Sequence, residues 1–227
     1  MRVNVQVENS ENRSNIILIN NIRVQSKPVY DFFKRLFDIL LSLTALIVLS
    51  PVMIIVTLLV FLQDFHNPIF SQVRLTKDCK EFKMYKFRSM CVNAEEKIEE
   101  LKKYNEVSGP AFKMEDDPRI TKIGKFLRKT SLDELPQLIN ILEGSMSIVG
   151  PRPPLPSEVE EYTPYQLQRL NVKGGLTCYW QCSGRSNIDF DKWVALDIKY
   201  IKERSIFTDL TIILKTVKAV LKGDGAK

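Results

Sequence analysis

A run of twenty-four residues without a formal charge, Ile39–Leu62, constrains the fold more than any other feature of this sequence. About 20 apolar residues are enough for a helix to cross a ~30 Å hydrocarbon core. A soluble helix of this length that is apolar on every face would be unusual in a chain of 227 residues. The run therefore predicts a segment that inserts into a membrane.

Ser50 and Pro51 stand at the midpoint of this run. Proline removes one helical donor and clashes with the preceding turn, and the Ser50 hydroxyl can satisfy a carbonyl freed there. Lys34 and Arg35 precede the run, and further cations follow it: Arg74, Lys77, Lys80, Lys83, Lys86 and Arg88. Because basic flanks prefer the cytoplasmic side, we expect a re-entrant membrane helix over residues 34–63, broken at Ser50-Pro51. A kinked helix that spans the bilayer is the alternative.

The rest of the chain predicts a polar N-terminal extension over residues 1–33 and one compact α+β domain over residues 64–227. Short apolar alternations at residues 69–75 and 81–90, around a polar turn, indicate a β-hairpin. Residues 93–104 carry Glu and Lys at four-residue offsets, which is typical of an exposed helix. A chain of this length can bury a core without disulfide or metal staples.

Two further segments have the pattern of amphipathic helices. In residues 119–130 four apolar side chains share one stripe, and every charge is positive. In residues 206–222 a longer apolar stripe leaves three lysines outside it. Such helices either dock on the core with a solvated basic face or lie among anionic lipid headgroups. The stretch between them, residues 150–184, is rich in Gly and Pro and predicts mostly ordered loop.

Charge and cysteine usage narrow the chemistry. The chain has 33 basic and 27 acidic residues, and its net charge of +6 indicates an anionic partner such as phosphate, nucleic acid or lipid headgroups. The four cysteines form no C-x-x-C pair, and the single histidine, His66, lies far from Cys178 and Cys182 in sequence. This pattern argues against a zinc site and against histidine-dependent triads. Any catalysis would then depend on carboxylates and cations.

The segment Ser131-Leu132-Asp133-Glu134-Leu135-Pro136-Gln137 has two interpretations. Structurally, Ser131 and Glu134 have the spacing of a capping box, and carboxylates in a first turn suit the helix dipole. Chemically, Asp133 and Glu134 could bind Mg²⁺ while the metal contacts a diphosphate. A carboxylate could also attack phosphorus directly and form an acyl phosphate.

Arg152 strengthens the chemical interpretation. Pro151 and Pro153 restrict the backbone on either side of it, so its guanidinium can be held in position at little entropic cost. The planar guanidinium suits bidentate binding of phosphate oxygens. An acid pair, a metal ion and an arginine together form a phosphoryl-transfer site.

Several motifs occur in a specific order along the chain: KRLFD before a predicted membrane helix with Ser-Pro at its centre, then KMYKFRSM, SLDELPQLINILEGSMSIVGPRPP and GGLTCYWQCSGR. Over about residues 34–222 this order resembles the bacterial sugar transferases, small monotopic phosphoglycosyl transferases. The resemblance implies transfer of a sugar 1-phosphate from a UDP-sugar donor to the acceptor undecaprenyl phosphate, through a covalent aspartyl phosphosugar intermediate. UMP would be released, and the product would initiate polysaccharide or glycoconjugate synthesis.

The resemblance also implies a cofactor, a location and partners. The cofactor would be Mg²⁺. The enzyme would be monotopic in the bacterial inner (cytoplasmic) membrane, with its catalytic domain facing the cytoplasm. Membrane lipids are expected partners, nucleic acid is not, and a second copy of the chain is a candidate partner in a homodimer.

The family's functional residues carry over motif by motif. Asp133 matches the nucleophile, and Glu134 matches its partner in the acid pair, with which it would hold Mg²⁺. Further residues match positions expected to bind phosphate or the nucleotide sugar: Lys86, Arg88, Arg128, Arg152, Gln181 and Arg185. Lys34, Arg35 and Asp38 match the motif that begins the membrane helix at the cytoplasmic interface.

Two other functions are open to the sequence. A catalytically inactive membrane anchor could recruit glycan-assembly proteins, but it would not need an acid pair beside a rigid arginine. A basic nucleic-acid binder would not need a broken membrane helix, and its basic helices would carry base-contacting polar residues. The sequence does not specify the sugar: galactose or an N-acetylhexosamine would fit.

Overall fold

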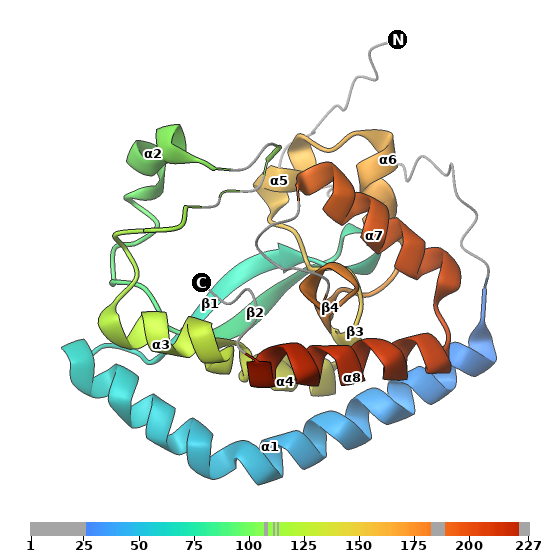
Figure 1. Cartoon of the computed structure of the whole chain (residues 1–227), viewed down its shortest axis with the longest axis horizontal. Helices are drawn as coiled ribbons and strands as arrows, with labels where there is room; N and C mark the ends of the chain where they lie inside the picture. The colour runs from blue at the N-terminus through green and yellow to red at the C-terminus, as the bar shows by residue number, and fades with distance from the viewer. Residues whose placement is uncertain (1–25, 107–108, 111, 113, 183–188, 223–227) are drawn as a thin grey trace.

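A long helix, α1 (Pro28–Asp64), lies along one side of the computed structural model, and the other elements lie on one side of it (Figure 1). The structure describes residues 26–106, 109–110, 112, 114–182 and 189–222. Pro28 stands in the first turn, where its missing N–H costs no hydrogen bond. The helix therefore begins before the expected start at residue 34, and it ends where Phe65 adopts a left-handed conformation (φ 57°).

α1 stays helical through Ser50 and Pro51, so the predicted break is instead a bend near the middle of one continuous helix (Figure 1). Pro51 has no N–H to donate to the carbonyl of Ile47, and the Ser50 hydroxyl donates to that carbonyl at 2.8 Å. The hydroxyl thus replaces the missing hydrogen bond. α1 is long and apolar enough to cross a membrane, and 11% of its most apolar 18-residue window is buried. So little burial is unlike a helix in the core of a soluble domain.

The elements after α1 are short. The strands and α-helices are β1 (Ile69–Leu75), β2 (Glu81–Phe87), α2 (Ile98–Leu101), α3 (Lys122–Thr130), α4 (Gln137–Glu143), β3 (Ser147–Val149), α5 (Pro156–Glu160), α6 (Pro164–Leu167), β4 (Gly175–Thr177), α7 (Phe190–Glu203) and α8 (Ile206–Lys222). Single 3-10 turns lie between them at Lys77–Cys79, Lys102–Tyr104, Leu132–Glu134, Gln168–Asn171 and Trp180–Cys182.

The strands form two separate pairs. β1 and β2 make the predicted antiparallel hairpin, with Ile69 opposite Phe87. β2 ends there and does not continue to Met90, which pairs instead with Ile120 in an isolated bridge. β3 and β4 form a parallel pair. The described part of the chain therefore mixes helices and strands, as predicted.

Two expectations about local structure need correction. The exposed helix predicted over residues 93–104 is α-helical only in α2 and continues as a 3-10 turn. The stretch after residue 150, predicted as mostly loop, contains α5, α6 and β4. Both of these helices have a proline in the first turn, at Pro156 and Pro164, where proline favours a helix start.

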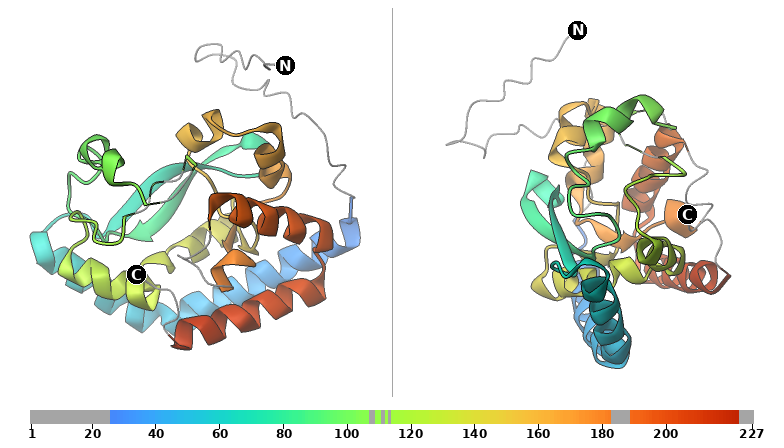
Figure 2. Two further views of the ribbon diagram at one scale, coloured as in Figure 1. Left: turned by 45° about the horizontal axis from the view of Figure 1, so that its top comes forward. Right: turned by 90° about the vertical axis from the view of Figure 1, so that its left-hand side faces the viewer.

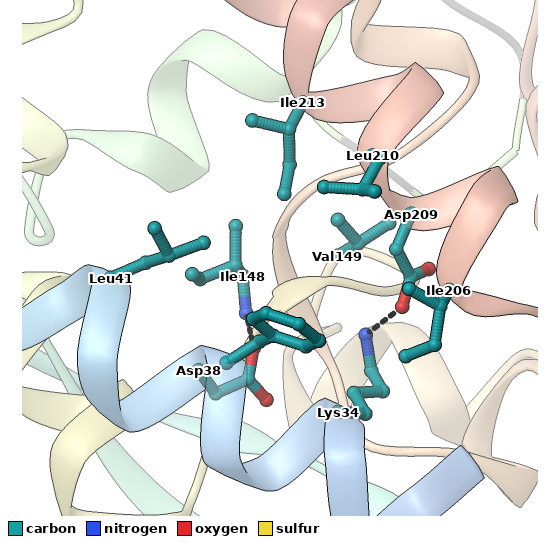
Figure 3. Close-up of a pocket in the computed structure, with 10 residues that line it drawn as sticks. Lys34, Asp38, Leu41, Ile148, Val149, Ile206, Asp209, Leu210 and Ile213 are labelled. Atoms are coloured by element: carbon teal, nitrogen blue, oxygen red, sulfur yellow. Dashed lines mark hydrogen bonds and ion pairs between the residues drawn. The ribbon is translucent and has the colours of Figure 1, made fainter.

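The motif at the start of the membrane helix ties α1 to three other elements. Lys34 pairs with Asp209 of α8 at 2.8 Å, and Asp38 accepts a hydrogen bond from the backbone N–H of Ile148 in β3 at 2.9 Å. Arg35 donates to two carbonyl groups at the C-terminal end of α4, at 2.6 and 2.7 Å. Figure 3 shows the small pocket between α1, β3 and α8, whose lining includes the first two contacts. These charges anchor the helix.

The two amphipathic helices pack differently. α3 buries Leu127 fully, while Phe126 is 56% exposed. Arg119 does not belong to its basic face, because the helix begins at Lys122 and Arg119 is buried before it. α8 runs beside α1 (Figures 1 and 2) and buries Ile212, but much of its apolar stripe is exposed, including Phe207 and Leu214. An exposed apolar stripe next to α1 favours the lipid-facing alternative for α8.

Candidate active site

A tight 3-10 turn between α3 and α4 carries the acid pair Asp133 and Glu134. Ser131 ends α3 in the left-handed region (φ 57°) and makes no capping hydrogen bond with its side chain. The predicted capping box is therefore wrong, and α4 begins only at Gln137. The carboxylates do not belong to the first turn of α4, so stabilisation by its dipole does not account for them.

Lys86 of β2 reaches the acid pair from the hairpin. Its Nζ donates to Glu134 Oε1 at 2.8 Å and lies 3.8 Å from Asp133 Oδ2. The fully buried Asn140 of α4 holds β2 in place: its amide donates to the carbonyl of Lys83 at 2.8 Å and accepts from the N–H of Tyr85 at 3.0 Å. One side chain thus continues the hydrogen bonding of a strand edge and fixes the strand that carries Lys86.

Asp133 is buried, with 6% of its surface exposed. Burial raises the pKa of its carboxyl group above the ordinary value, and the negative charge of Glu134 adds to this effect. The positive charges of Lys86 and Arg128 act in the opposite direction. The result is a poorly solvated carboxylate beside cations, a state that suits attack on an electrophilic phosphorus.

Three arginines, Arg74, Arg128 and Arg152, interact electrostatically, and two of them, Arg74 and Arg128, also interact with the acid pair. Arg128, in the last turn of α3, donates from Nε to the hydroxyl of Ser89 at 2.9 Å. Burial lowers the pKa of Arg128, whereas the charge of Asp133 raises it. The charge of Arg152 also lowers the pKa of Arg128 and that of the buried Arg74. Within the described ranges, no carboxylate lies within 4.0 Å of these three guanidinium groups. Arg128 and Arg152 therefore provide cations without a paired acid, which are suited to bind phosphate.

Two other predicted residues have neighbours away from the acid pair. Both Nη atoms of Arg88 donate to the carboxylate of Asp64, so Arg88 joins the base of the hairpin to the end of α1. Gln181, in the 3-10 turn that follows β4, donates to the carbonyl of Leu176 within β4 at 2.8 Å. The predicted Arg185 lies outside the described residues.

The donor set for a metal consists of two adjacent carboxylates. Among the residues that the structure describes, no group of three or more His, Cys, Asp or Glu side chains could hold a metal ion by itself. Mg²⁺ commonly binds through one or two carboxylates and completes its shell with substrate phosphates and water. Asp133 and Glu134 fit that mode, in which the phosphates of the substrate are part of the site.

The sequence matches the bacterial sugar transferase family over residues 29–223. The chain belongs to this family. It is 50% identical over 195 residues to the galactosyl transferase CpsE of Streptococcus agalactiae, a match that covers 86% of this chain and 43% of CpsE. It is 44% identical over 211 residues to the undecaprenyl-phosphate galactose phosphotransferase of Salmonella typhimurium, covering 91% of this chain and 44% of that protein.

The chain therefore spans less than half the length of these two relatives. A relative of similar extent is the exopolysaccharide production protein ExoY of Sinorhizobium fredii. This chain and ExoY are 40% identical over 204 residues, which cover 88% of this chain and 90% of ExoY. The chain is thus similar to a part of two longer proteins and to nearly the whole length of ExoY.

Sequence reasoning about this sugar transferase missed three buried polar residues: Arg74, Asn140 and Arg169. In the sequence, Arg74 is one of the cations that follow the apolar run, and a cation in an alternating strand resembles a solvated one. Arg169 lies in a 3-10 turn within a stretch predicted as loop. No local pattern distinguishes a buried polar side chain from an exposed one, because its partners come from distant parts of the chain.

Proposed function

We propose that this bacterial sugar transferase transfers a sugar 1-phosphate from a UDP-sugar to undecaprenyl phosphate, releases UMP, and so initiates polysaccharide or glycoconjugate synthesis. The observation that carries the proposal is the buried Asp133 beside Glu134 and Lys86, with Arg128 near Asp133 and Arg152 near Arg128. The names of relatives support the substrates. One is the UDP-glucose:undecaprenyl-phosphate glucose-1-phosphate transferase of Escherichia coli, 40% identical over 207 residues.

In the first step, a carboxylate oxygen of Asp133 attacks the phosphorus that carries the sugar. The bond between this phosphorus and the bridging oxygen of the diphosphate breaks, and UMP leaves with that oxygen. A covalent aspartyl phosphosugar remains on the enzyme. Lys86, Arg128 and Arg152 would offset the negative charge that gathers on the phosphate oxygens.

In the second step, a phosphate oxygen of undecaprenyl phosphate attacks the same phosphorus. The bond from phosphorus to Asp133 breaks, which regenerates the carboxylate and yields undecaprenyl-diphosphate-sugar. The lipid acceptor would approach from the side of α1, whose apolar side chains are largely exposed.

Mg²⁺ is proposed as the cofactor, held by Asp133 and Glu134. When bound, it would supply positive charge close to the donor diphosphate. Lys86 donates to Glu134 at 2.8 Å, so it orients this carboxylate. Removal of divalent cations by a chelator should stop UMP release, and added Mg²⁺ should restore it.

The location proposed is the bacterial inner membrane, with α1 re-entrant and the catalytic domain in the cytoplasm. Both ends of α1 are tied to the same domain, by Lys34 with Asp209 at one end and by Asp64 with Arg88 at the other. A domain cannot lie on both faces of a bilayer, so these two ties favour a helix that returns to its own leaflet. Whether two copies form a homodimer remains a prediction.

The topology can be tested with single cysteines in residues 1–27 and 93–104 of an otherwise cysteine-free chain. A membrane-impermeant maleimide should label neither position in intact cells and both after lysis. Labelling of the N-terminal position alone in intact cells would establish a spanning helix. Pro51→Ala gives the helix a backbone donor for Ile47 and should expose some N-terminal positions if the bend sets the topology.

The reaction can be tested by incubating the purified chain with undecaprenyl phosphate and a panel of UDP-sugars. UDP-galactose, UDP-glucose and UDP-N-acetylgalactosamine belong in the panel, since relatives are named for these sugars. At least one donor should give UMP and, without acceptor, a labelled sugar phosphate on the protein. Absence of UMP with every donor, from protein that is folded and supplied with Mg²⁺, would refute the proposed function.

A further inference from the structure

All four carbonyl groups of Pro151–Pro154 accept hydrogen bonds. The outer two, of Pro151 and Pro154, accept from backbone N–H groups of Gly175 and Leu75 at 2.9 and 3.0 Å. The inner two accept from buried arginine side chains. Three residues of this segment are prolines and lack a backbone N–H. Hydrogen bonds to the backbone of these prolines can therefore be made only through their carbonyl groups.

Arg169 holds the carbonyl of Arg152 at 3.3 Å through Nη2. Its side chain is almost completely buried and fixed by two more contacts. Nε pairs with the carboxylate of Asp197 at 2.8 Å, and Nη1 donates to the hydroxyl of Tyr162 at 2.7 Å. Because the guanidinium is planar and rigid, these two partners determine where Nη2 points.

Arg74 holds the next carbonyl, that of Pro153, at 3.2 Å through Nη1. Its Nη2 donates to the side chain of Gln72 at 2.8 Å. Burial and the nearby charge of Arg152 lower the pKa of Arg74 to about 10, so it stays charged at neutral pH. Arg74 is opposite Phe82 in the hairpin, and Lys86 is opposite Phe70, so strand alternation places both cations on one face.

We propose that Arg74 and Arg169 are positioning residues: by holding the carbonyl groups of Arg152 and Pro153, they fix where the Arg152 guanidinium lies relative to Asp133. This inference rests on the proposed function. Burying two arginines is costly compared with packing apolar side chains in the same space. A misplacement of ~1 Å at a reacting centre can lower the rate on the order of 100-fold. Precise placement of Arg152 would therefore explain why the protein buries two arginines.

The test is a double-mutant cycle between Arg169→Lys and Arg152→Lys in the purified full chain. Lysine at position 169 can still neutralise Asp197, but one ammonium group cannot also reach Tyr162 and the carbonyl of Arg152. Arg169→Lys should lower kcat/KM for UMP release by ~10-fold in the wild-type background. In the Arg152→Lys background it should have little further effect, because the guanidinium that it positions is gone. Equal losses in both backgrounds would overturn the proposal.

Arg119→Lys is the matched control. Arg119 is also buried, pairs with an aspartate (Asp117, 2.6 Å) and donates to a backbone carbonyl, that of Ala94 at 3.2 Å. Arg119→Lys should lower the midpoint of thermal unfolding about as much as Arg169→Lys does. Any effect of Arg119→Lys on kcat/KM should be the same in the wild-type and Arg152→Lys backgrounds. If the cycle for Arg119 were as non-additive as the cycle for Arg169, the positioning role of Arg169 would be overturned. Burial of an arginine would then be enough to explain the non-additivity.

Two further measurements keep the inference testable. If Arg169→Lys does not fold, Tyr162→Phe removes the hydroxyl that orients Arg169 without changing charge. This variant should lower kcat/KM only in the presence of Arg152.

The same cycles for Arg169 and Arg74 can be measured as equilibrium binding of UDP. UDP binding with non-additive cycles but no UMP release from any donor would support the positioning role and refute the proposed reaction. Additive cycles with normal UMP release would support the proposed reaction and refute the positioning role. A chain that neither binds UDP nor releases UMP would overturn both proposals.

Discussion

Two aspartates flank α3 with almost equal exposed fractions, and their pKa values shift in opposite directions. Asp117, before the helix, is 5% exposed, and Asp133, after it, is 6% exposed. Burial raises the pKa of both carboxyl groups. For Asp117 the hydrogen bonds and charge of Arg119 outweigh burial, and its pKa is lowered overall. For Asp133 the closest cation in an ion pair, Lys86, is 3.8 Å away, and the pKa stays raised.

The difference lies in partner geometry and in depth, because Asp133 is surrounded by more protein than Asp117. Arg119 donates to both carboxylate oxygens of Asp117, with Nη2 at 2.6 Å and Nε at 2.9 Å. Asp133 has no such fork, and its neighbour Glu134 repels it. A buried carboxylate that is paired supports the fold, whereas one that is poorly paired costs stability and is available for chemistry. The exposed fraction alone does not distinguish the two roles.

The largest expected effect is on turnover. Asp133→Asn should lower the rate of UMP release by ~10⁴-fold or more, because the amide cannot act as the nucleophile. It should also abolish trapping of a labelled sugar phosphate, while membrane association persists. The same change at Asp117 should leave turnover per folded molecule close to that of the wild type. Turnover of Asp133→Asn within tenfold of the wild type would exclude it as the nucleophile.

The next effect is on stability, and here the change at Asp117 has the larger effect. Asp117→Asn leaves Arg119 buried without its carboxylate and should lower the free energy of unfolding by ~3 kcal/mol. Asp133→Asn removes a poorly solvated charge and should leave this free energy unchanged or raise it at pH 7. Denaturant unfolding of both variants in detergent measures the contrast. Equal destabilisation by the two changes would show that Asp133 is a structural residue.

A smaller effect separates the arginines of the two regions. Arg152→Lys keeps the charge but loses the planar fork, so it should lose ~1–3 kcal/mol of transition-state stabilisation. This loss corresponds to a fall in kcat/KM of roughly 5- to 150-fold. Steady-state kinetics with the preferred UDP-sugar checks it. A wild-type kcat/KM in Arg152→Lys would mean that Arg152 does not contact the phosphates in the transition state.

The smallest effect is the pH dependence of stability. Both carboxyl groups have an ordinary pKa of 3.8. The contribution of Asp117, whose pKa is lowered in the folded state, is present above pH ~3.8 and is lost as the pH falls through the folded value. The contribution of Asp133, whose pKa is raised, is present below pH ~3.8 and is lost as the pH rises through the folded value.

Unfolding free energies measured between pH 3 and pH 7 should therefore diverge for the two asparagine variants. Relative to the wild type, Asp133→Asn should gain stability as the pH rises, and Asp117→Asn should lose it. Parallel curves for the two variants would show that the two carboxyl groups titrate alike in the folded protein.

The site was partly predictable from the sequence. The motif around Asp133 and Glu134 and the contact from Lys86 involve residues that the sequence analysis named, and the structure brings these three together. Arg88, named for phosphate binding, pairs with Asp64. The capping box at Ser131 failed because this residue adopts a left-handed conformation and ends one helix without capping the next.

The sequence by itself determined the features that depend on neighbouring residues. The long apolar helix α1, the hairpin and α8 follow from apolar runs and periodicities, and the Ser50 hydroxyl lies one residue before the proline that it compensates. Only the tertiary structure decided which charges are paired, which are buried, and which hold the backbone of Arg152. Arg74 is 79 residues from the carbonyl it holds, and Arg169 is 28 residues from Asp197. A local pattern cannot encode such partners, because the energy of a charge depends on what the fold places around it.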